Sequence, residues 1–486
     1  MKTIYRISKQ LLVTLLLSLI ILPAAGQTPS TEYFMESSYQ RLSFNPALRP
    51  RQGYINIPGL GATSADAQTN TLNLDHLAFK KDGKTVLFTS SLVSADEFLS
   101  DMSKNNYLGA GVNESFLGAG WFINQKGFLF VDISVRIDAE ANIPYSFFEF
   151  AKKGIADNVA SQYNFKNFEI DARSYIDIGA GYSHSLLDND LVVGGKFKVL
   201  LGLAYVNGKI NEMNINAGID EWIVNSDISI QGALMGSQIT PEYKVKNGVE
   251  RFDDINTDFK FGIPGFGLGL DLGASFNLGG LTHFFPDIDN VNLLKRFNFS
   301  LAFTNIGFIS WSKSKTTHLA SKMEDTVITG SYQIDLDNSN SLGDQVDELT
   351  ERLKDIVDLK EQDAKGRTTS LSTNMNIGLE YEAIPEKLSV GILSATRFNP
   401  VKTTSELTLG GSYRPCNWFE AGLSYSCIFN QFNTFGLALH IAPKKGVNFF
   451  LSSDYLVPSV NKEFIPVKAK GMNFLVGVSI PIGARR

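Results

Sequence analysis

Large apolar residues alternate with small or polar residues along most of the chain beyond about residue 115. In TFGLALHIA (434–442), Phe, Leu, Leu and Ile occupy every second position, with Gly, Ala and His between them. The stretch FGLGLDLGASFNL (266–278) repeats this pattern, with Gly, Asp, Ser and Asn opposite Phe and Leu. A period of two predicts β-strands whose two faces lie in different surroundings.

Stretches of this kind predict about 14 strands, within a range of about 12 to 16. Two shorter candidates, 53–61 and 326–336, would raise the number of strands to 16. The predicted strands are 115–124, 127–140, 167–186, 190–215, 219–236, 259–279, 295–311, 369–383, 387–398, 404–414, 417–428, 432–442, 446–456 and 470–482.

The composition of the second face distinguishes two kinds of all-β protein. A soluble sandwich normally places many Lys, Glu and Thr residues on its solvent face, whereas here that face is rich in Gly, Ser, Asn and Ala. Small residues suit a crowded barrel interior, and the 11% aromatic content suits interfacial girdles. The fold class we expect is therefore an all-β, transmembrane antiparallel β-barrel with short turns on one side and longer loops on the other.

The first 26 residues read as a signal peptide, because basic residues precede the apolar run LLVTLLLSLIILPAAG and small residues end it. A retained membrane anchor is the alternative interpretation. Cleavage after Gly26 removes three of 44 basic residues and leaves 41 against 50 acidic ones, a net charge of −9. That balance argues against a nucleic-acid partner. We expect residues 27–114 to form an N-terminal plug and the first barrel elements, and 115–486 to form the barrel.

Three segments have a helical pattern instead of alternation. Residues 94–103 and 145–154 predict short helices, and 341–363 predicts a longer amphipathic one. The last is either a loop insertion or an element that docks a partner or covers the barrel.

Catalytic and metal-binding motifs are missing from the sequence. No GxSxG, HExxH or P-loop occurs, the histidines have no ligand spacing, and DIDNVN (287–292) matches a calcium loop poorly. We therefore expect no enzymatic activity, no cofactor and no metal. Cys416 and Cys427 bracket a predicted strand, so about 36 Å separates them and no disulfide is expected.

Charged residues at predicted lumen positions are candidates for a polar path through the barrel. Ion pairs that merely fill the interior are the simpler interpretation of the same residues. The candidates are Asp177, Lys196, Lys198, Asp271, Glu380, Glu406, Arg414 and Glu420.

Three short motifs carry a family resemblance: SFNPAL (43–48), NTLNLDHLAF (70–79) and FSLAFTNIGFISW (299–311). With the strand pattern, they resemble the FadL-type superfamily of outer-membrane proteins. That group includes long-chain fatty-acid and hydrocarbon transporters and the PorV-like and PorP-like barrels of secretion and gliding systems. The motifs look most like an uncharacterised family of such barrels, and the resemblance extends over essentially the whole mature chain.

The resemblance implies a location in the outer membrane and two different functions. One is a FadL-like porter or channel for a small, hydrophobic compound, and the other is a non-transporting scaffold with an envelope protein partner. In the transporters the motif lies in a plug inside the barrel, so the resemblance makes Asn45, Pro46 and Ala47 candidate plug or gate residues. An ordinary turn before the first strand is the alternative. The many polar lumen positions depart from the apolar lining of a fatty-acid path.

Overall fold

The computed structural model describes residues 28–72, 78–81, 84–88, 90, 92–153, 161–218, 221–246, 249–329, 357–364, 366–428, 431–443, 446–456 and 471–484. The predicted signal peptide, 1–26, lies outside these residues.

The described strands form a closed barrel of 14 antiparallel strands, as predicted. The first position is shared by β1 (Gly53–Asn56) and β2 (Ala62–Thr69), which pair with β5 on one side and with the last strand, β24, on the other. The remaining barrel strands are β5 (Asn105–Phe122), β6 (Gly127–Pro144), β8 (Phe168–Leu186), β9 (Leu191–Ala217), β13 (Gly265–Asn277), β14 (Phe297–Trp311), β18 (Thr373–Ile384), β19 (Leu388–Phe398), β20 (Thr404–Cys416), β21 (Phe419–Ile428), β22 (Gln431–Ile441), β23 (Asn448–Ser453) and β24 (Gly471–Ile482).

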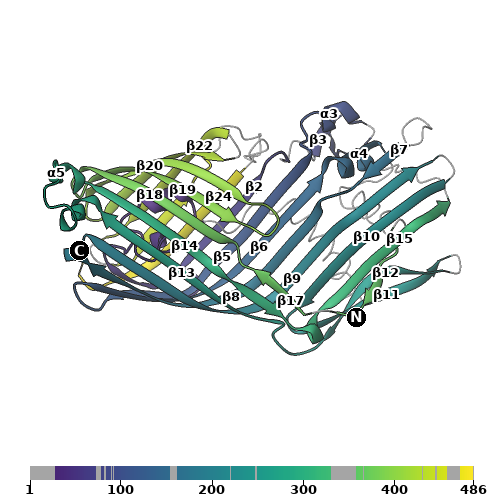
Figure 1. Ribbon diagram of the computed structural model, residues 1–486, viewed down its shortest axis with the longest axis horizontal. Coiled ribbons are helices and arrows are strands. Elements are labelled where there is room, and N and C mark those ends of the chain that lie inside the picture. The colour runs from purple at the N-terminus through teal and green to yellow at the C-terminus, as the bar shows by residue number, and fades with distance from the viewer. Residues whose placement is uncertain are drawn as a thin grey trace.

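Strand β9 is 27 residues long and extends past the rest of the barrel. Its first part, 191–202, pairs with β13, and its second part, 204–217, pairs with β10 (Glu221–Leu234). Strands β10 and β13 therefore occupy one position in the wall, and β14 continues in the same way into β15 (Thr317–Thr329). Figure 1 shows β9, β10 and β15 running beyond the barrel, to the right of the view.

The structure has the predicted number of barrel strands, 14, but it changes which predicted segments supply them. The predicted strands 219–236 and 259–279 make one barrel position between them, whereas the candidate 53–61 is part of a full barrel strand. Alternation reveals each strand, but only pairing shows which strands share a position. Of the candidate 326–336, residues 326–329 belong to β15, and the rest lie outside the described residues.

The extension beyond the barrel carries small elements and two hydrophobic clusters. One cluster surrounds Trp222 and Phe150, and the other surrounds Phe98 and Phe148. Predicted helices 94–103 and 145–154 correspond to α3 (Ala95–Leu99) and α4 (Tyr145–Lys153). The further strands are β3 (Ala78–Lys81), β4 (Lys84–Leu87), β7 (Ser161–Asn164), β11 (Ser237–Lys246), β12 (Val249–Phe259), β16 (Lys360–Gln362) and β17 (Arg367–Ser370).

The predicted helix 341–363 falls mainly outside the described residues. Its described end is not helical: Lys360–Gln362 form β16, which pairs with β15. The prediction is wrong for the described residues 357–363, none of which is helical, because the edge of β15 provides Lys360–Gln362 with backbone hydrogen-bond partners in an extended conformation.

The barrel is apolar outside and polar inside. On β13, Phe266 is 55% exposed, whereas Asp271 on the other face is only 4% exposed. Leu423 on β21 is 66% exposed, and its neighbour Ser424 is buried. A continuous outer belt of exposed Phe, Leu, Ile and Val around a polar interior fits a lipid environment and not water. The barrel is therefore a transmembrane one. None of the described helices is long and apolar enough to cross a membrane, a result that does not concern strands.

The two ends of the barrel differ. Short turns such as 187–190 and 385–387 lie at the end where the C-terminus lies, together with one long connection, 278–296 (Figure 1). The connection between β6 and β8, which contains α4 and β7, lies at the other end. In outer-membrane barrels the short turns face the periplasm. Short 3₁₀ and α turns occur beside several strands: η3 (Leu187–Asn189), η4 (Leu278–His283), α5 (Val291–Leu294) and η5 (Lys313–Lys315). Cys416 and Cys427 are free thiols, as predicted.

Candidate functional site

Residues 28–52, here called the lumenal segment, lie inside the barrel. Two 3₁₀ turns, η1 (Ser30–Phe34) and η2 (Tyr39–Ser43), give the segment its compact form. Tyr33, Phe34 and Phe44 pack on one another and on Leu393 of β19. Most of residues 29–50 are buried, although this segment has no strand partner. Its backbone groups therefore need other partners.

Carboxylates on the barrel wall supply several of those partners. Asp454, just after β23, accepts hydrogen bonds from the backbone N–H groups of Ser30 (2.5 Å) and Thr31 (3.0 Å). Glu420 on β21 accepts from the N–H groups of Glu36 (3.0 Å) and Ser37 (2.9 Å). Each carboxylate thus holds two consecutive N–H groups, a charge-assisted arrangement that is stronger than a neutral one.

Two ion pairs add to this attachment. The guanidinium group of Arg41 lies 2.6 Å from Glu380 of β18, with both side chains about one-tenth exposed or less. Arg414 of β20 lies 3.1 Å from Glu36. Three of the predicted lumen charges, Glu380, Arg414 and Glu420, therefore contact the lumenal segment.

The Asn45-Pro46-Ala47 motif is seated against the wall. The Asn45 side-chain oxygen accepts from the Ala47 N–H at 2.8 Å, which closes a local turn. Its Nδ2 donates to the carbonyl groups of Ala274 (2.9 Å) and Leu301 (3.4 Å) on two neighbouring strands. The motif thus forms a local turn and is also hydrogen-bonded to the barrel wall.

Glycines on the wall make room for this motif. An added Cβ at Gly194 of β9 would lie 2.5 Å from the Pro46 carbonyl oxygen and 2.8 Å from the Ala47 nitrogen. At Gly273 of β13, it would overlap the Asn45 side chain. Because no larger residue fits either position with the motif in place, these glycines shape the seat of the lumenal segment.

Four of the other predicted lumen charges, Asp177, Lys196, Lys198 and Asp271, form a network on β6, β8, β9 and β13. Lys196 pairs with Asp132 at 2.7 Å, and Lys198 pairs with Asp271 at 2.8 Å. Lys198 also lies 3.7 Å from Asp177. Asp177 in turn lies 3.4 Å from the Nε of Arg136, a residue that the sequence reasoning did not single out. The charges balance within the network, so it adds no net charge to the lumen.

This network supports a β-bulge in the wall. Asn305 of β14 has φ 57°, its N–H donates to Asp271 (2.6 Å), and its side chain accepts from Lys198 (2.6 Å). The bulge reverses which residues face the lumen, since Phe303 and Ile306 both point outward. Beyond it Trp311 faces inward and is 2% exposed.

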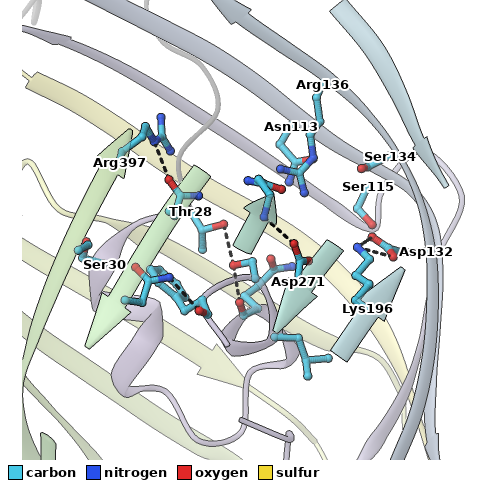
Figure 2. Close-up of a pocket in the computed structure, with 18 of the residues that line it drawn as sticks. Thr28, Ser30, Asn113, Ser115, Asp132, Ser134, Arg136, Lys196, Asp271 and Arg397 are labelled. Atoms are coloured by element: carbon cyan, nitrogen blue, oxygen red, sulfur yellow. Dashed lines mark hydrogen bonds and ion pairs between the residues drawn. The ribbon is translucent and has the colours of Figure 1, made fainter. Parts of the chain in front are cut away.

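A polar cavity of about 150 Å³ lies between the lumenal segment and the wall. Figure 2 shows Lys196 and Asp132 facing each other on one side of it and Arg397 on the opposite side. Asn113, Ser134 and Glu406 also line it, and Glu406 accepts a hydrogen bond from Thr408 at 2.9 Å. Amide, hydroxyl and charged groups dominate this lining, whereas Leu42, Phe44, Phe130, Ala395 and Ile428 are its apolar members.

Two carboxyl groups of the lumenal segment have shifted pKa values in opposite directions. Burial raises the pKa of Glu32 to about 7, and the hydroxyl groups of Ser38 and Ser452 offset this only in part. Burial also favours the neutral form of Glu36, but three guanidinium groups outweigh it and lower the pKa of Glu36: those of Arg41, Arg414 and Arg51.

Several contacts of the site were absent from the sequence predictions. Asp132 and Arg136 stand in the alternating stretch of β6 at lumen-facing positions, so the period of two could have found them. Asp454 and Asn305 carry no such signal, because one follows a strand end and the other sits in a bulge.

Solved structures that resemble this chain are outer-membrane barrels. The toluene transporter TbuX of Ralstonia pickettii is 8% identical with a TM-score of 0.33, over 94% of this chain and 99% of that one. The toluene transporter TodX of Pseudomonas putida is 8% identical with a TM-score of 0.36, over 94% and 97%. The translocator domain of the autotransporter NalP from Neisseria meningitidis is 8% identical with a TM-score of 0.28, over 88% of each chain.

Sequence identities and TM-scores this low identify no solute or partner for this chain. No curated protein matches the sequence. The profile of one family does match, over residues 46–454, and the match starts at Pro46 of the seated motif and includes every barrel strand from β1 to β23. This chain belongs to the family of unknown function DUF5723.

Proposed function

We propose that this protein is an outer-membrane porter for a small polar solute, with the lumenal segment as its gate. The observation that carries the proposal is the polar cavity directly against the lumenal segment, inside a closed transmembrane barrel. A solute in that cavity would meet amide, hydroxyl and charged groups. A polar solute is thus favoured over the hydrophobic one implied by the FadL resemblance.

The gate function is supported by how the segment is held. Its attachments include hydrogen bonds and ion pairs to wall carboxylates. Its apolar contacts are the Tyr33–Phe44 cluster and, on the opposite wall, the contacts of Leu42 and Tyr39 with aromatic residues such as Phe128 and Phe450. Polar contacts exchange with water when they break, at a net cost of about 1.5–3 kcal/mol for a hydrogen bond to a charged group. The segment pairs with none of the described barrel strands, so it can leave the wall without breaking the backbone hydrogen bonds that close the barrel.

Liposome swelling tests the proposal. Purified protein is reconstituted and challenged with isotonic glycine, arabinose and sucrose. The wild type should swell slowly, and a variant lacking residues 28–48 should swell faster with the two smaller solutes. The same folded barrel with no solute flux in either form would contradict the porter function.

A scaffold is the second candidate, and the extension of β9, β10 and β15 favours it. This extension carries its own hydrophobic clusters and rises beyond the membrane-spanning belt, where an envelope partner could bind. Purification from detergent-solubilised envelopes discriminates between the two functions. A stoichiometric protein partner together with no flux in either form of the barrel would establish the scaffold.

A further inference from the structure

The hairpin of β11 and β12 is inserted between β10 and β13 and exposes aromatic residues at its base. Phe259 is 84% exposed, Phe261 88% and Ile263 49%. A contiguous group of exposed apolar side chains marks a surface that contacts a protein, a ligand or a membrane. We call residues 259–263 together with η5 (Lys313–Lys315) the hairpin-base patch.

Backbone hydrogen bonds bring the parts of this patch together. The Lys260 N–H donates to the Gly236 carbonyl at 3.0 Å, and the Ser312 N–H donates to the Pro264 carbonyl at 2.8 Å. The Lys315 ammonium group donates to the carbonyl of Phe261 at 2.6 Å. Residues from three chain segments therefore form one surface.

The patch lies at the edge of the lipid-facing belt. Gly265 and Trp311 follow and precede the patch in the chain and pair with each other. They belong to the end of β13 and β14 that is farther from the C-terminus (Figure 1). From Gly265 onward, the outward side chains of β13 are exposed and apolar: Phe266, Leu268, Leu270 and Leu272. The aromatic residues of the patch thus continue the belt to its outer boundary.

The charge of the patch is positive. Residues 235–238, 258–264 and 312–316 contain three lysines and one acidic residue, Asp258. The Lys260 ammonium group donates to the side-chain oxygen of Gln238 at 2.9 Å, and Lys315 binds backbone carbonyls, so neither of these contacts uses a carboxylate. Lys313 is exposed. Lysines next to aromatic residues at a membrane boundary attract anionic headgroups.

We propose that the hairpin-base patch binds a phosphorylated glycolipid of the outer leaflet. Phe259, Phe261 and Ile263 enter the boundary between acyl chains and headgroups, and Lys260 and Lys313 contact the lipid phosphates. Lys315 holds the patch together through the Phe261 carbonyl. The proposal requires a barrel that spans the membrane, but it does not depend on transport.

Native mass spectrometry of the full chain in detergent tests this assignment. The probes are bisphosphorylated lipid A, monophosphorylated lipid A, phosphatidylcholine and inorganic phosphate. The test variant is Lys260→Gln/Lys313→Gln, and the control is Lys209→Gln/Lys322→Gln, which removes two exposed lysines farther along the extension. Each basic residue near an anionic surface contributes about fivefold in affinity, so the test variant should lose roughly thirtyfold for bisphosphorylated lipid A.

The control should bind as the wild type does, and Phe261→Ser should weaken both lipid A and phosphatidylcholine. Equal affinity of wild type and test variant for bisphosphorylated lipid A would overturn the proposal. So would equal binding of phosphatidylcholine and lipid A by the wild type, since the lysines would then have no role. Full displacement of lipid A by inorganic phosphate would reassign the patch to a free anion.

Discussion

A substitution that adds a single methyl group to the wall tests how Asn45-Pro46-Ala47 packs against the barrel. Gly194→Ala adds a Cβ on the lumen side of β9, directly against the motif. Gly195→Ala is the matched control, since its Cβ would lie 3.5 Å from the Asp271 carbonyl oxygen and 3.7 Å from a Leu272 methyl, both ordinary contacts. The two variants have the same composition and differ only in the face that they crowd.

The size of the effect follows from the distances. The new Cβ at residue 194 would lie 2.5 Å from the Pro46 carbonyl oxygen, and a comfortable contact is about 3.5 Å, so the motif must move by about 1 Å. Overpacking of this kind costs about 1–3 kcal/mol. Strained or lost Asn45 hydrogen bonds add about 1 kcal/mol. Together these terms disfavour the seated state by about 2–4 kcal/mol, which raises the unseated fraction roughly thirtyfold to a thousandfold.

Thiol labelling measures this fraction directly. Ala47 is 3% exposed, so Ala47→Cys in a Cys416→Ser/Cys427→Ser background should react slowly with a charged maleimide. Adding Gly194→Ala should raise the labelling rate by the factor above, whereas adding Gly195→Ala should leave it unchanged. Heat-modifiable migration on a gel confirms that each barrel is folded. A folded Gly194→Ala protein that labels as slowly as the control would refute the argument that this glycine shapes the seat.

The remaining predictions concern charged residues. Asp454→Ala removes the acceptor of two backbone N–H groups, each worth about 1.5–3 kcal/mol, so limited proteolysis of the lumenal segment should accelerate; an unchanged rate would exclude this anchor. The pKa of Glu32, raised to about 7, means that the seated segment binds an extra proton between about pH 4.5 and 7. The binding of the lumenal segment to the wall should therefore weaken as the pH rises through this window, by roughly 3 kcal/mol in all. Labelling of Ala47→Cys should show this pH dependence, and the additional substitution Glu32→Gln should remove it. Lys198→Met leaves buried Asp271 and Asp177 without their ammonium partner and should destabilise the barrel by about 3–5 kcal/mol. This loss should lower the temperature at which the barrel unfolds in the gel-shift assay. Lys209→Met, which removes one member of an exposed ion pair, should leave that temperature unchanged.

The period-of-two pattern was sufficient for the barrel because it records the environment of each face directly. Lipid selects large apolar side chains and the crowded lumen selects small or polar ones, so each strand carries the information independently of its neighbours. The same reasoning placed charged residues such as Lys198 and Glu420 in the lumen.

The alternating pattern does not predict which side chains contact each other, because such contacts join residues hundreds of positions apart in the chain. Arg41 pairs with Glu380, and Asp454 binds the backbone of Ser30, yet no local pattern links either pair. The bulge at Asn305 also escaped the pattern, since one extra residue reverses the alternation and turns Trp311 inward.

By itself, the sequence determined that this protein is a transmembrane barrel of about 14 strands with a distinctive Asn-Pro-Ala motif near its N-terminus. Only the tertiary structure decided that β10 and β13 share one position, that the motif lies between two wall glycines, and that the cavity beside it is polar. The physical reason is that alternation is a property of each strand alone, whereas seats, ion pairs and cavities exist only once distant strands have closed around the same space.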